Sequence, residues 1–310
     1  MKAILKATLL AFASGLLAFA LVACGNTGQA STAASGGASG AEGQGGSRED
    51  VEAILNQAAD QPFSTVTFKI TTSTSTTVPD DEGVMQTQSA DTATTGELDQ
   101  SGDKPAMHMS YRATSTVELG RTEYELFVNS ERLIAKEGDQ LYVEEMDDEA
   151  LYSYSQSVTS AISREEIEAM LDVAASFEIS ESDGETTVTI TADPAKLADS
   201  QEQIGESDLP ENSTIATMVI SYTIGTDGHF KTVRTISSLD SEPIYHMNQT
   251  CQYSNYDATS LPEWPDLQAY ILEQSGIETD ENGNMYFVDE DGQTHYITEI
   301  GEDGTIYFMQ

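Results

Sequence analysis

The chain has 310 residues, in which 53 Asp and Glu face only 13 Lys and Arg, so its formal net charge is −40 at pH 7. This balance excludes nucleic acids as partners, because phosphate binding needs a basic patch that so few cations cannot form. The chain has only two cysteines, Cys24 and Cys251. A hydrophobic content of 38% is compatible with a sheet that buries one face.

Residues 1–23 are organised like an export signal. Lys2 and Lys6 precede an apolar stretch that stops at Cys24, and no basic residue follows before Arg48. A basic start, an apolar centre and small residues before the break are typical of a secretory signal, which is not part of the fold. A retained transmembrane helix is the alternative, but such a span usually ends in Lys or Arg.

The residues around the first cysteine resemble the lipobox of bacterial lipoproteins. Leu21-Val22-Ala23-Cys24 is followed by Gly25, so small residues stand on both sides of the cysteine. In that family the signal is cut before the cysteine, and a diacylglyceryl group is joined to its sulfur. Two acyl chains give a stable anchor where one binds a bilayer only marginally. The resemblance implies lipid attachment at Cys24, on the extracytoplasmic face of the bacterial cell membrane; a plain secretory signal is the alternative.

Residues 24–47 are predicted to be a flexible linker, because Gly, Ser, Ala, Thr and Gln dominate them. The folded part is predicted to begin at residue 48 with an amphipathic helix that Ser47 caps. The apolar stripe of this helix has the spacing i, i+3, i+4 and i+7 and consists of Val51, Ile54, Leu55 and Ala58.

A series of antiparallel strands is predicted next. From Ser64 to Val78, the apolar residues Val66, Phe68 and Ile70 alternate with Thr and Lys, which predicts a half-buried strand. Comparable alternation, separated by Gly-Asp and Asn-Ser turns, recurs in residues 106–116, 122–128, 133–136 and 141–145. These runs predict a meander.

A capped helix is then predicted to interrupt the strands. Ser163 and Glu166 form a capping box, with the Glu166 side chain reaching back, and Ile162 and Ile167 have the spacing of a hydrophobic staple. The apolar stripe, which must lie on a sheet or in its hollow, continues through Ile167, Met170 and Leu171.

Residues 185–192 are predicted to be a strand, residues 193–205 a short helix, and residues 214–224, 229–238 and 243–256 three closing strands. Cys251 lies on the apolar face of the last strand, so it is interpreted as a buried thiol and not a reactive one. If Cys24 is acylated, no intramolecular disulfide is possible, so the stability of the chain must come from a hydrophobic core.

Residues 266–310 are predicted to form a small acidic appendage. A helix over 266–275 precedes short strands around Asn-Gly and Asp-Gly turns. The acidic turns at 280–284 and 289–292 contain fragments of calcium loops, but they have neither the closing Glu nor flanking helices, so solvated hairpin turns are the preferred interpretation.

No motif for nucleophilic catalysis, phosphate binding or zinc hydrolysis is found in the sequence. We therefore expect no enzyme, no catalytic residue and no cofactor. The triplet Met107-His108-Met109 combines copper ligands, but His108 must point to the opposite face of a strand from the two Met, so no metal site is predicted.

The order of elements over residues 48–265 resembles the family of lipoproteins of Gram-positive bacteria that are similar to the carrier LolA and to LppX and LprG. The residues that carry this resemblance are Pro105-Ala106-Met107-His108-Met109-Ser110-Tyr111, Leu126-Phe127-Val128-Asn129, Asp139-Gln140-Leu141-Tyr142-Val143, Tyr253-Ser254-Asn255-Tyr256 and Leu261-Pro262-Glu263. The resemblance implies an α+β fold: a curved antiparallel half-barrel, two to three helices on its concave face, and the hairpin appendage outside the family pattern.

In that family the hollow between sheet and helices holds acyl chains or another apolar ligand. The resemblance therefore implies that the ligand cavity is lined by Val66, Phe68, Ile70, Ile167, Met170 and Leu171. It implies a membrane-anchored, non-enzymatic carrier or receptor for a lipid or other apolar ligand. The alternative is an envelope interaction protein that binds a partner protein or the cell wall through its sheet or its C-terminal hairpins.

Overall fold

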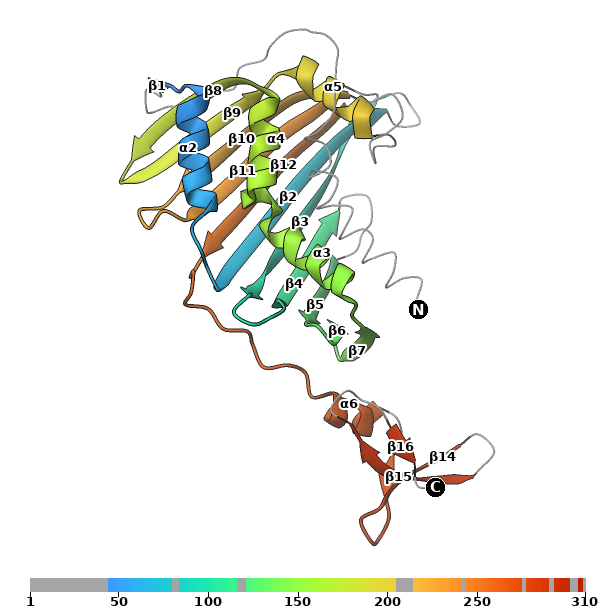
Figure 1. Ribbon diagram of the computed structural model, residues 1–310. Helices are drawn as coiled ribbons and strands as arrows, with labels where there is room; N and C mark the ends of the chain where they lie inside the picture. The colour runs from blue at the N-terminus through green and yellow to red at the C-terminus, as the bar shows by residue number, and fades with distance from the viewer. Residues whose placement is uncertain are drawn as a thin grey trace.

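The structure, a computed structural model, describes residues 44–79, 84–115, 121–204, 214–240, 244–274, 277–289, 293–301 and 306–308. The predicted signal, the predicted lipid-attachment residue Cys24 and the predicted linker up to residue 43 lie outside the described residues. The main part is a large open antiparallel sheet with helices on one face, and a small sheet follows at the C-terminal end (Figure 1). The predicted α+β class, a curved antiparallel sheet with a C-terminal appendage, is confirmed.

Twelve strands form the main sheet, in the order β1-β8-β9-β10-β11-β12-β2-β3-β4-β5-β6-β7. β12 is the last strand of this sheet in chain order, and it pairs antiparallel with β2, the first strand after α2. This pairing puts the longest strands at the centre of the sheet. The strands are β1 (Gln44–Gly45), β2 (Thr65–Pro79), β3 (Met85–Asp99), β4 (Ala106–Ser115), β5 (Arg121–Val128), β6 (Arg132–Glu137), β7 (Gln140–Glu145), β8 (Ala174–Ser182), β9 (Glu185–Ala192), β10 (Thr214–Ile224), β11 (Phe230–Asp240) and β12 (Ile244–Ser254).

The helices α2 (Arg48–Ala59), α3 (Asp148–Thr159) and α4 (Arg164–Asp172) cross one face of this sheet, and a single turn of 3-10 helix, η2 (Ser160–Ile162), joins α3 to α4 (Figure 1). A further helix, α5 (Pro194–Ile204), lies at one end of the sheet. The predicted helices after Ser47, Ser163 and Asp193 are therefore confirmed.

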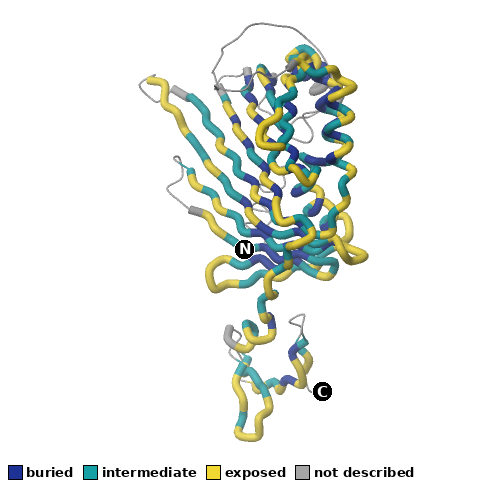
Figure 2. The backbone as a smooth tube through the Cα atoms, turned by 90° about the vertical axis from the view of Figure 1, so that its left-hand side faces the viewer, coloured by how far each residue is buried: buried dark blue, intermediate teal, exposed yellow. Residues whose placement is uncertain are grey.

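The core lies between the helices and the sheet. Because side chains alternate across each strand, Val66, Phe68 and Ile70 of β2 all face the helices and are at most 4% exposed. They join Leu55 of α2 and Ile167 of α4 in one continuous apolar cluster. Buried segments alternate with more exposed ones along the strands of the main sheet (Figure 2).

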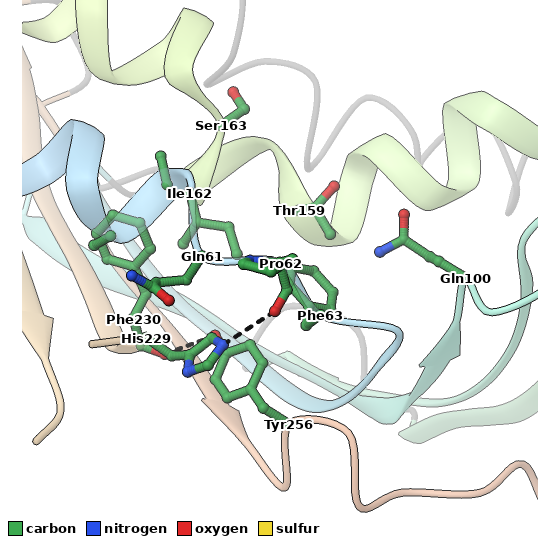
Figure 3. Close-up of a pocket in the computed structure, with 12 residues that line it drawn as sticks. Gln61, Pro62, Phe63, Gln100, Thr159, Ile162, Ser163, His229, Phe230 and Tyr256 are labelled. Atoms are coloured by element: carbon green, nitrogen blue, oxygen red, sulfur yellow. Dashed lines mark hydrogen bonds between the residues drawn. The ribbon is translucent and has the colours of Figure 1, made fainter. Parts of the chain in front are cut away.

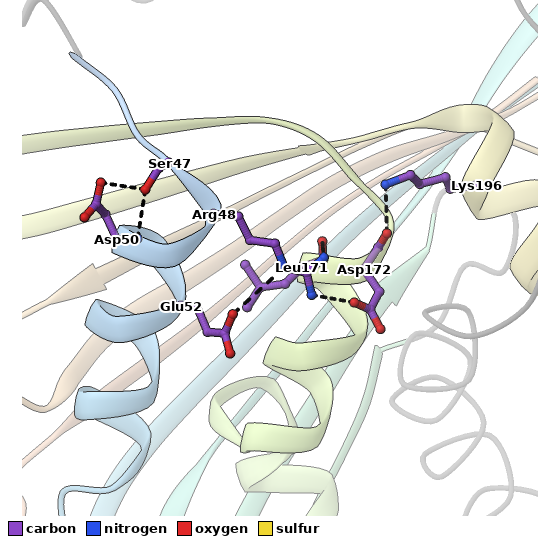
Figure 4. Close-up of polar contacts among 7 residues, drawn as sticks. All are labelled: Ser47, Arg48, Asp50, Glu52, Leu171, Asp172 and Lys196. Atoms are coloured by element: carbon purple, nitrogen blue, oxygen red, sulfur yellow. Dashed lines mark hydrogen bonds and ion pairs between the residues drawn. The ribbon is translucent and has the colours of Figure 1, made fainter.

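The helices α2 and α4 are antiparallel neighbours, tied together at both ends. At one end the guanidinium of Arg48 donates to the carbonyl oxygen of Leu171 at 3.2 Å and pairs with Asp172 at 2.5 Å (Figure 4). At the other end Arg164 forms an ion pair with Asp60. All four charged side chains are about half exposed or more, so each pair contributes about 1 kcal/mol or less to stability. Their role is to fix the direction of the helices.

The capping of α4 is confirmed in one half and differs in the other. The Ser163 hydroxyl accepts a hydrogen bond from the Glu166 amide at 3.3 Å, as predicted. The backbone N–H of Ser163, however, donates to Ser160 of the preceding 3-10 turn at 2.9 Å, so it is not the partner of the Glu166 side chain. The carboxyl group of Glu166 instead lies half-buried, and this burial raises its pKa from 4.5 to about 7.

Replacing Glu166 with glutamine should stabilise the protein increasingly between pH 4.5 and pH 7. Because the folded pKa is raised, the unfolded chain ionises first as the pH rises, which favours unfolding until the folded carboxyl ionises as well. Glutamine removes this penalty, so the variant should gain on the order of 1 kcal/mol at pH 8 after discounting for the exposed part of the side chain. Urea unfolding at pH 4.5 and pH 8 measures the difference.

The control for Glu166→Gln is Glu168→Gln, which removes one charge from an exposed position of the same helix. A gain for Glu166→Gln that is the same at both pH values, or equal to that of the control, would contradict the assignment.

Five elements of the structure have no counterpart in the sequence prediction: β1, η2, β3, α3 and β8. β1 lies within residues 24–47, which the sequence predicts to be a flexible linker, and it is a strand because it pairs with β8. β3 has few large apolar residues, since small and polar side chains such as Thr92 and Ala93 occupy it, and so its alternation is invisible. In α3, Ser155 takes a buried place in the stripe between Leu151 and Val158, which weakens the helical pattern. β8 lies next to the edge of the sheet, where β1 is the strand that pairs with its outer side among the described residues, and most of its side chains are exposed or half-buried, so its apolar alternation is weak.

The C-terminal appendage contains α6 (Leu267–Gln274) and a four-stranded sheet in the order β13-β14-β15-β16. Its strands are β13 (Glu278–Thr279), β14 (Met285–Val288), β15 (Thr294–Ile300) and β16 (Ile306–Phe308). In the turn between β13 and β14, the Asp280 carboxylate accepts the amide N–H groups of Asn282 and Asn284 at 2.8 and 2.9 Å. The Asp280 carboxylate thus makes hydrogen bonds within its own turn. Residues 290–292 of the second acidic turn lie outside the described residues.

A small apolar cluster connects the appendage to the outer face of the main sheet. Leu267 of α6 is 3% exposed and packs with Phe127 and Ile134 of β5 and β6. The ring of Trp264 lies 5.9 Å from that of Phe127. The appendage is therefore docked on the main sheet through its first helix.

Candidate functional site

A pocket of about 340 Å³ opens where α2 ends and η2 leads into α4. This is the end of the helix layer at which Arg164 pairs with Asp60. The side chains around it come from five separate parts of the chain (Figure 3). They are Ala58, Ala59, Gln61, Pro62, Phe63, Gln100, Thr159, Ile162, Ser163, His229, Phe230 and Tyr256.

Local sequence features place these side chains. Asp60 caps the C-terminus of α2, and Pro62, which cannot continue a helix, directs the chain towards β2. On the opposite wall, the predicted turn between β10 and β11 is confirmed, with Gly228 at φ +85°, a conformation that favours glycine. The turn puts His229 beside the loop that follows α2, and the two alanines at the end of that helix leave room for a cavity.

The aromatic side of the pocket is held together by Tyr256. Its ring stacks on His229 with centroids 4.2 Å apart and meets the edge of Phe63 at 5.4 Å. Its hydroxyl donates to the carbonyl oxygen of Phe230 at 2.7 Å. Burial raises the pKa of Tyr256, so the phenol remains protonated and keeps this donor in place. The wall is therefore fixed before any ligand enters.

His229 brings polar chemistry to this wall. Its Nε2 atom lies 3.4 Å from the carbonyl oxygen of Pro62. Its Nδ1 atom is buried and has no hydrogen-bond partner among the described residues, since the nearest carboxylate, Asp227, is 3.6 Å away and thus beyond hydrogen-bond distance. With the amides of Gln61 and Gln100, polar groups line the pocket to about the same extent as apolar groups.

The six ligand-cavity residues expected from the sequence lie elsewhere. Val66, Phe68, Ile70, Ile167, Met170 and Leu171 are brought together in the core, each at most 4% exposed. None of them is among the residues that line the pocket. Their side chains fill the space between α4 and the sheet, and the pocket lies past the end of that packed layer.

Sequence reasoning did not single out the pocket residues. The sequence predicts Ala58 as part of the helix stripe, Ser163 as a helix cap, and Tyr256 as the end of a strand that takes part in the family resemblance, but none of them as a site residue. No local motif unites them, because positions 58, 100, 159, 229 and 256 meet only through the tertiary fold. Two signals were available in the sequence. His229 directly follows the Asp-Gly turn, and the pair Pro62-Phe63 follows the first helix.

The structure also describes the residues considered above as metal ligands or as a reactive thiol. Met107 and Met109 are buried in the core, while His108 is on the outer face, where its Nδ1 atom lies 2.8 Å from Glu97. The expected opposite orientation of the triplet is confirmed. Cys251 is 3% exposed, and burial raises the pKa of its thiol to about 12, which confirms an unreactive buried thiol.

Within the described ranges, no three His, Cys, Asp or Glu side chains lie close enough together to share a metal ion. No helix in these ranges combines the length and the apolar composition that are needed to span a bilayer.

Fold and pocket together define the chain as an open antiparallel sheet covered by helices, with a small half-open pocket at the end of the helix layer. No protein-family model and no curated protein sequence matches the chain. Among solved structures, the chain is similar to LprF from Mycobacterium bovis, at 13% identity and a TM-score of 0.38, over 69% of this chain and 97% of that chain. A likeness of this size carries no argument about function.

Proposed function

We propose that this protein is a membrane-anchored, extracytoplasmic, non-enzymatic binding protein that holds a small amphipathic ligand in the pocket beside Tyr256. The observation that carries the proposal is the pocket itself, whose prearranged aromatic wall faces a gap left by alanines. Preformed cavities in which apolar walls meet placed polar groups are typical of small-molecule sites, and the even balance of polar and apolar lining here suits an amphipathic ligand.

The size and lining of the pocket support one class of ligand. A volume of about 340 Å³ is at the lower end of the range for small-molecule sites. Phe63, Ile162 and Phe230 suit an apolar body, and His229 with Gln61 suits one polar end. This combination fits a lipid with a single chain or a similar small amphiphile, and is too small for a complete diacyl lipid.

The proposed anchor at Cys24 is compatible with this placement. The first described strand, β1, forms the edge of the main sheet and pairs with β8 beside the start of α2. The pocket lies at the other end of α2, about 18 Å further along the helix axis. A linker between Cys24 and Gln44 is longer than this distance when extended, so the pocket can be turned towards the membrane or away from it.

Filling the pocket should abolish ligand binding without unfolding the protein. Ala59→Phe puts a ring into the cavity, so we expect the affinity for the neutral fluorescent probe N-phenyl-1-naphthylamine to fall at least about tenfold. The matched control is Ala53→Phe, the same substitution on the exposed side of the same helix. Titration uses the chain from Gly25 onward, which contains every described residue.

Native mass spectrometry of the same three proteins tests whether a natural ligand is present. The unchanged chain and Ala53→Phe should retain a bound amphiphile, and Ala59→Phe should not. Probe binding that is equal in all three proteins, with no bound species in any, would refute a ligand site in this pocket.

A further inference from the structure

The small C-terminal sheet has one face that the other described residues leave exposed. Its strands pair Glu278 with Tyr286, Tyr286 with Tyr296, and Glu299 with Tyr307. Directly paired residues point to the same side, and the register shift between Ile297 and Glu299 brings Glu299 back to the side of Tyr296. These five side chains therefore share one face, called here the tyrosine face. Tyr296 is 41% exposed and Tyr307 is 52% exposed.

The opposite face of this sheet explains why the tyrosines point outwards. Phe287 stacks on His295 at 5.0 Å and lies 5.8 Å from Phe308, and Ile297 and Ile300 are almost fully buried on this side. The sheet therefore has its own apolar side. The tyrosines are not needed for that core, and they stand on the surface as large, flat and rigid groups.

The charge of the appendage indicates which partners this face can accept. Residues 266–310 contain 11 Asp and Glu, and no Lys or Arg occurs anywhere after Arg234. Glu299 is exposed on the tyrosine face, and the hydroxyl of Tyr286 donates to Glu278 at 2.6 Å. Anionic lipids, nucleic acids and a second copy of this acidic chain are all repelled by such a surface.

We propose that the tyrosine face is a docking surface for an arginine-rich basic segment of another protein. A guanidinium group can stack on an exposed tyrosine ring and at the same time pair with a neighbouring carboxylate. Tyrosine and arginine are also enriched together at protein interfaces. The small sheet lies at the far end of the molecule from β1 (Figure 1), so a partner bound there leaves the start of the folded chain free.

The proposal is tested with the full chain in a non-ionic detergent and a fluorescent peptide of six Arg-Gly repeats, measured by anisotropy. The same peptide with citrulline in place of arginine, which has the shape but not the charge, should not bind. Replacing both Tyr296 and Tyr307 with serine should weaken binding of the arginine peptide about tenfold, as expected for two lost cation–π contacts. The control is Tyr152→Ser, which removes a tyrosine that is 48% exposed on α3.

Emission from Trp264, the single tryptophan, reports whether the appendage is still docked in the double variant. If that emission changes, Glu299→Gln replaces the double variant in the test and should weaken binding about threefold while leaving the tyrosines in place. Equal affinity of the double variant and the unchanged chain would overturn the proposal and show attraction by net charge alone. Absence of binding by the unchanged chain would overturn it as well.

Discussion

Gly96→Ala should lower the free energy of unfolding by about 3 kcal/mol or more, because an added methyl group has no space in the centre of the sheet. A Cβ atom at this position would lie 2.0 Å from the carbonyl oxygen of His108 and 2.9 Å from the ring of Phe68. The first contact is with the backbone of the neighbouring strand β4, which can yield only if the β3–β4 pairing opens.

Urea unfolding followed by far-UV circular dichroism measures this loss as a lower midpoint. The matched control is Gly102→Ala in the loop after β3, where a Cβ atom would meet nothing closer than 3.5 Å. The control should stay within about 0.5 kcal/mol of the unchanged protein. Equal midpoints for the two variants would show that β3 does not pass Phe68 as closely as described.

Leu171→Ala should cost about 3 kcal/mol of stability and leave ligand binding in the pocket unchanged. The side chain is 1% exposed between α4 and the sheet, so its removal leaves an apolar cavity that the packed neighbours cannot close. It does not line the pocket, which lies at the other end of α4. A loss of stability without a loss of ligand binding would therefore show that the core and the binding site are distinct.

Urea unfolding and titration with N-phenyl-1-naphthylamine measure both effects on the same protein. Leu272→Ala on α6 is the control, because this leucine is 37% exposed and should cost less than about 1 kcal/mol. If Leu171→Ala lost probe binding while Ala59→Phe kept it, the ligand would lie in the hollow between α4 and the sheet, among the six residues first expected from the sequence.

The elements that the sequence predicts well are those with strong local signals. The stripe after Ser47, the cap at Ser163 and the alternation around Phe68 each depend on neighbours within one or two turns, and the structure has all three. The same patterns identified Val66, Ile70, Ile167, Met170 and Leu171 as inward-facing residues, which is correct. They could not distinguish a filled hollow from an open one, because both bury the same faces.

The elements that the sequence does not predict lack strong local signals. β3 has 15 residues and pairs along its whole length with β2, yet small and polar residues occupy most of its inward positions. It is a strand because β2 and β4 on either side supply its hydrogen bonds, and Gly96 shows how closely it is held. Helix α3 likewise depends on the core for its stability, since Ser155 interrupts its apolar stripe.

From the residues in order one can read the acidic charge, the capped helices and the alternating strands, and one can predict an export signal with an anchor at Cys24. These are properties of composition and of contacts between near neighbours in the chain. The pairing of β12 with β2, the pocket and the tyrosine face depend on the tertiary structure. The first two join residues that are up to almost two hundred positions apart and meet only because the helices and the main sheet bury one shared core. The tyrosine face joins nearer residues, and the register of the small sheet decides which side each of them takes.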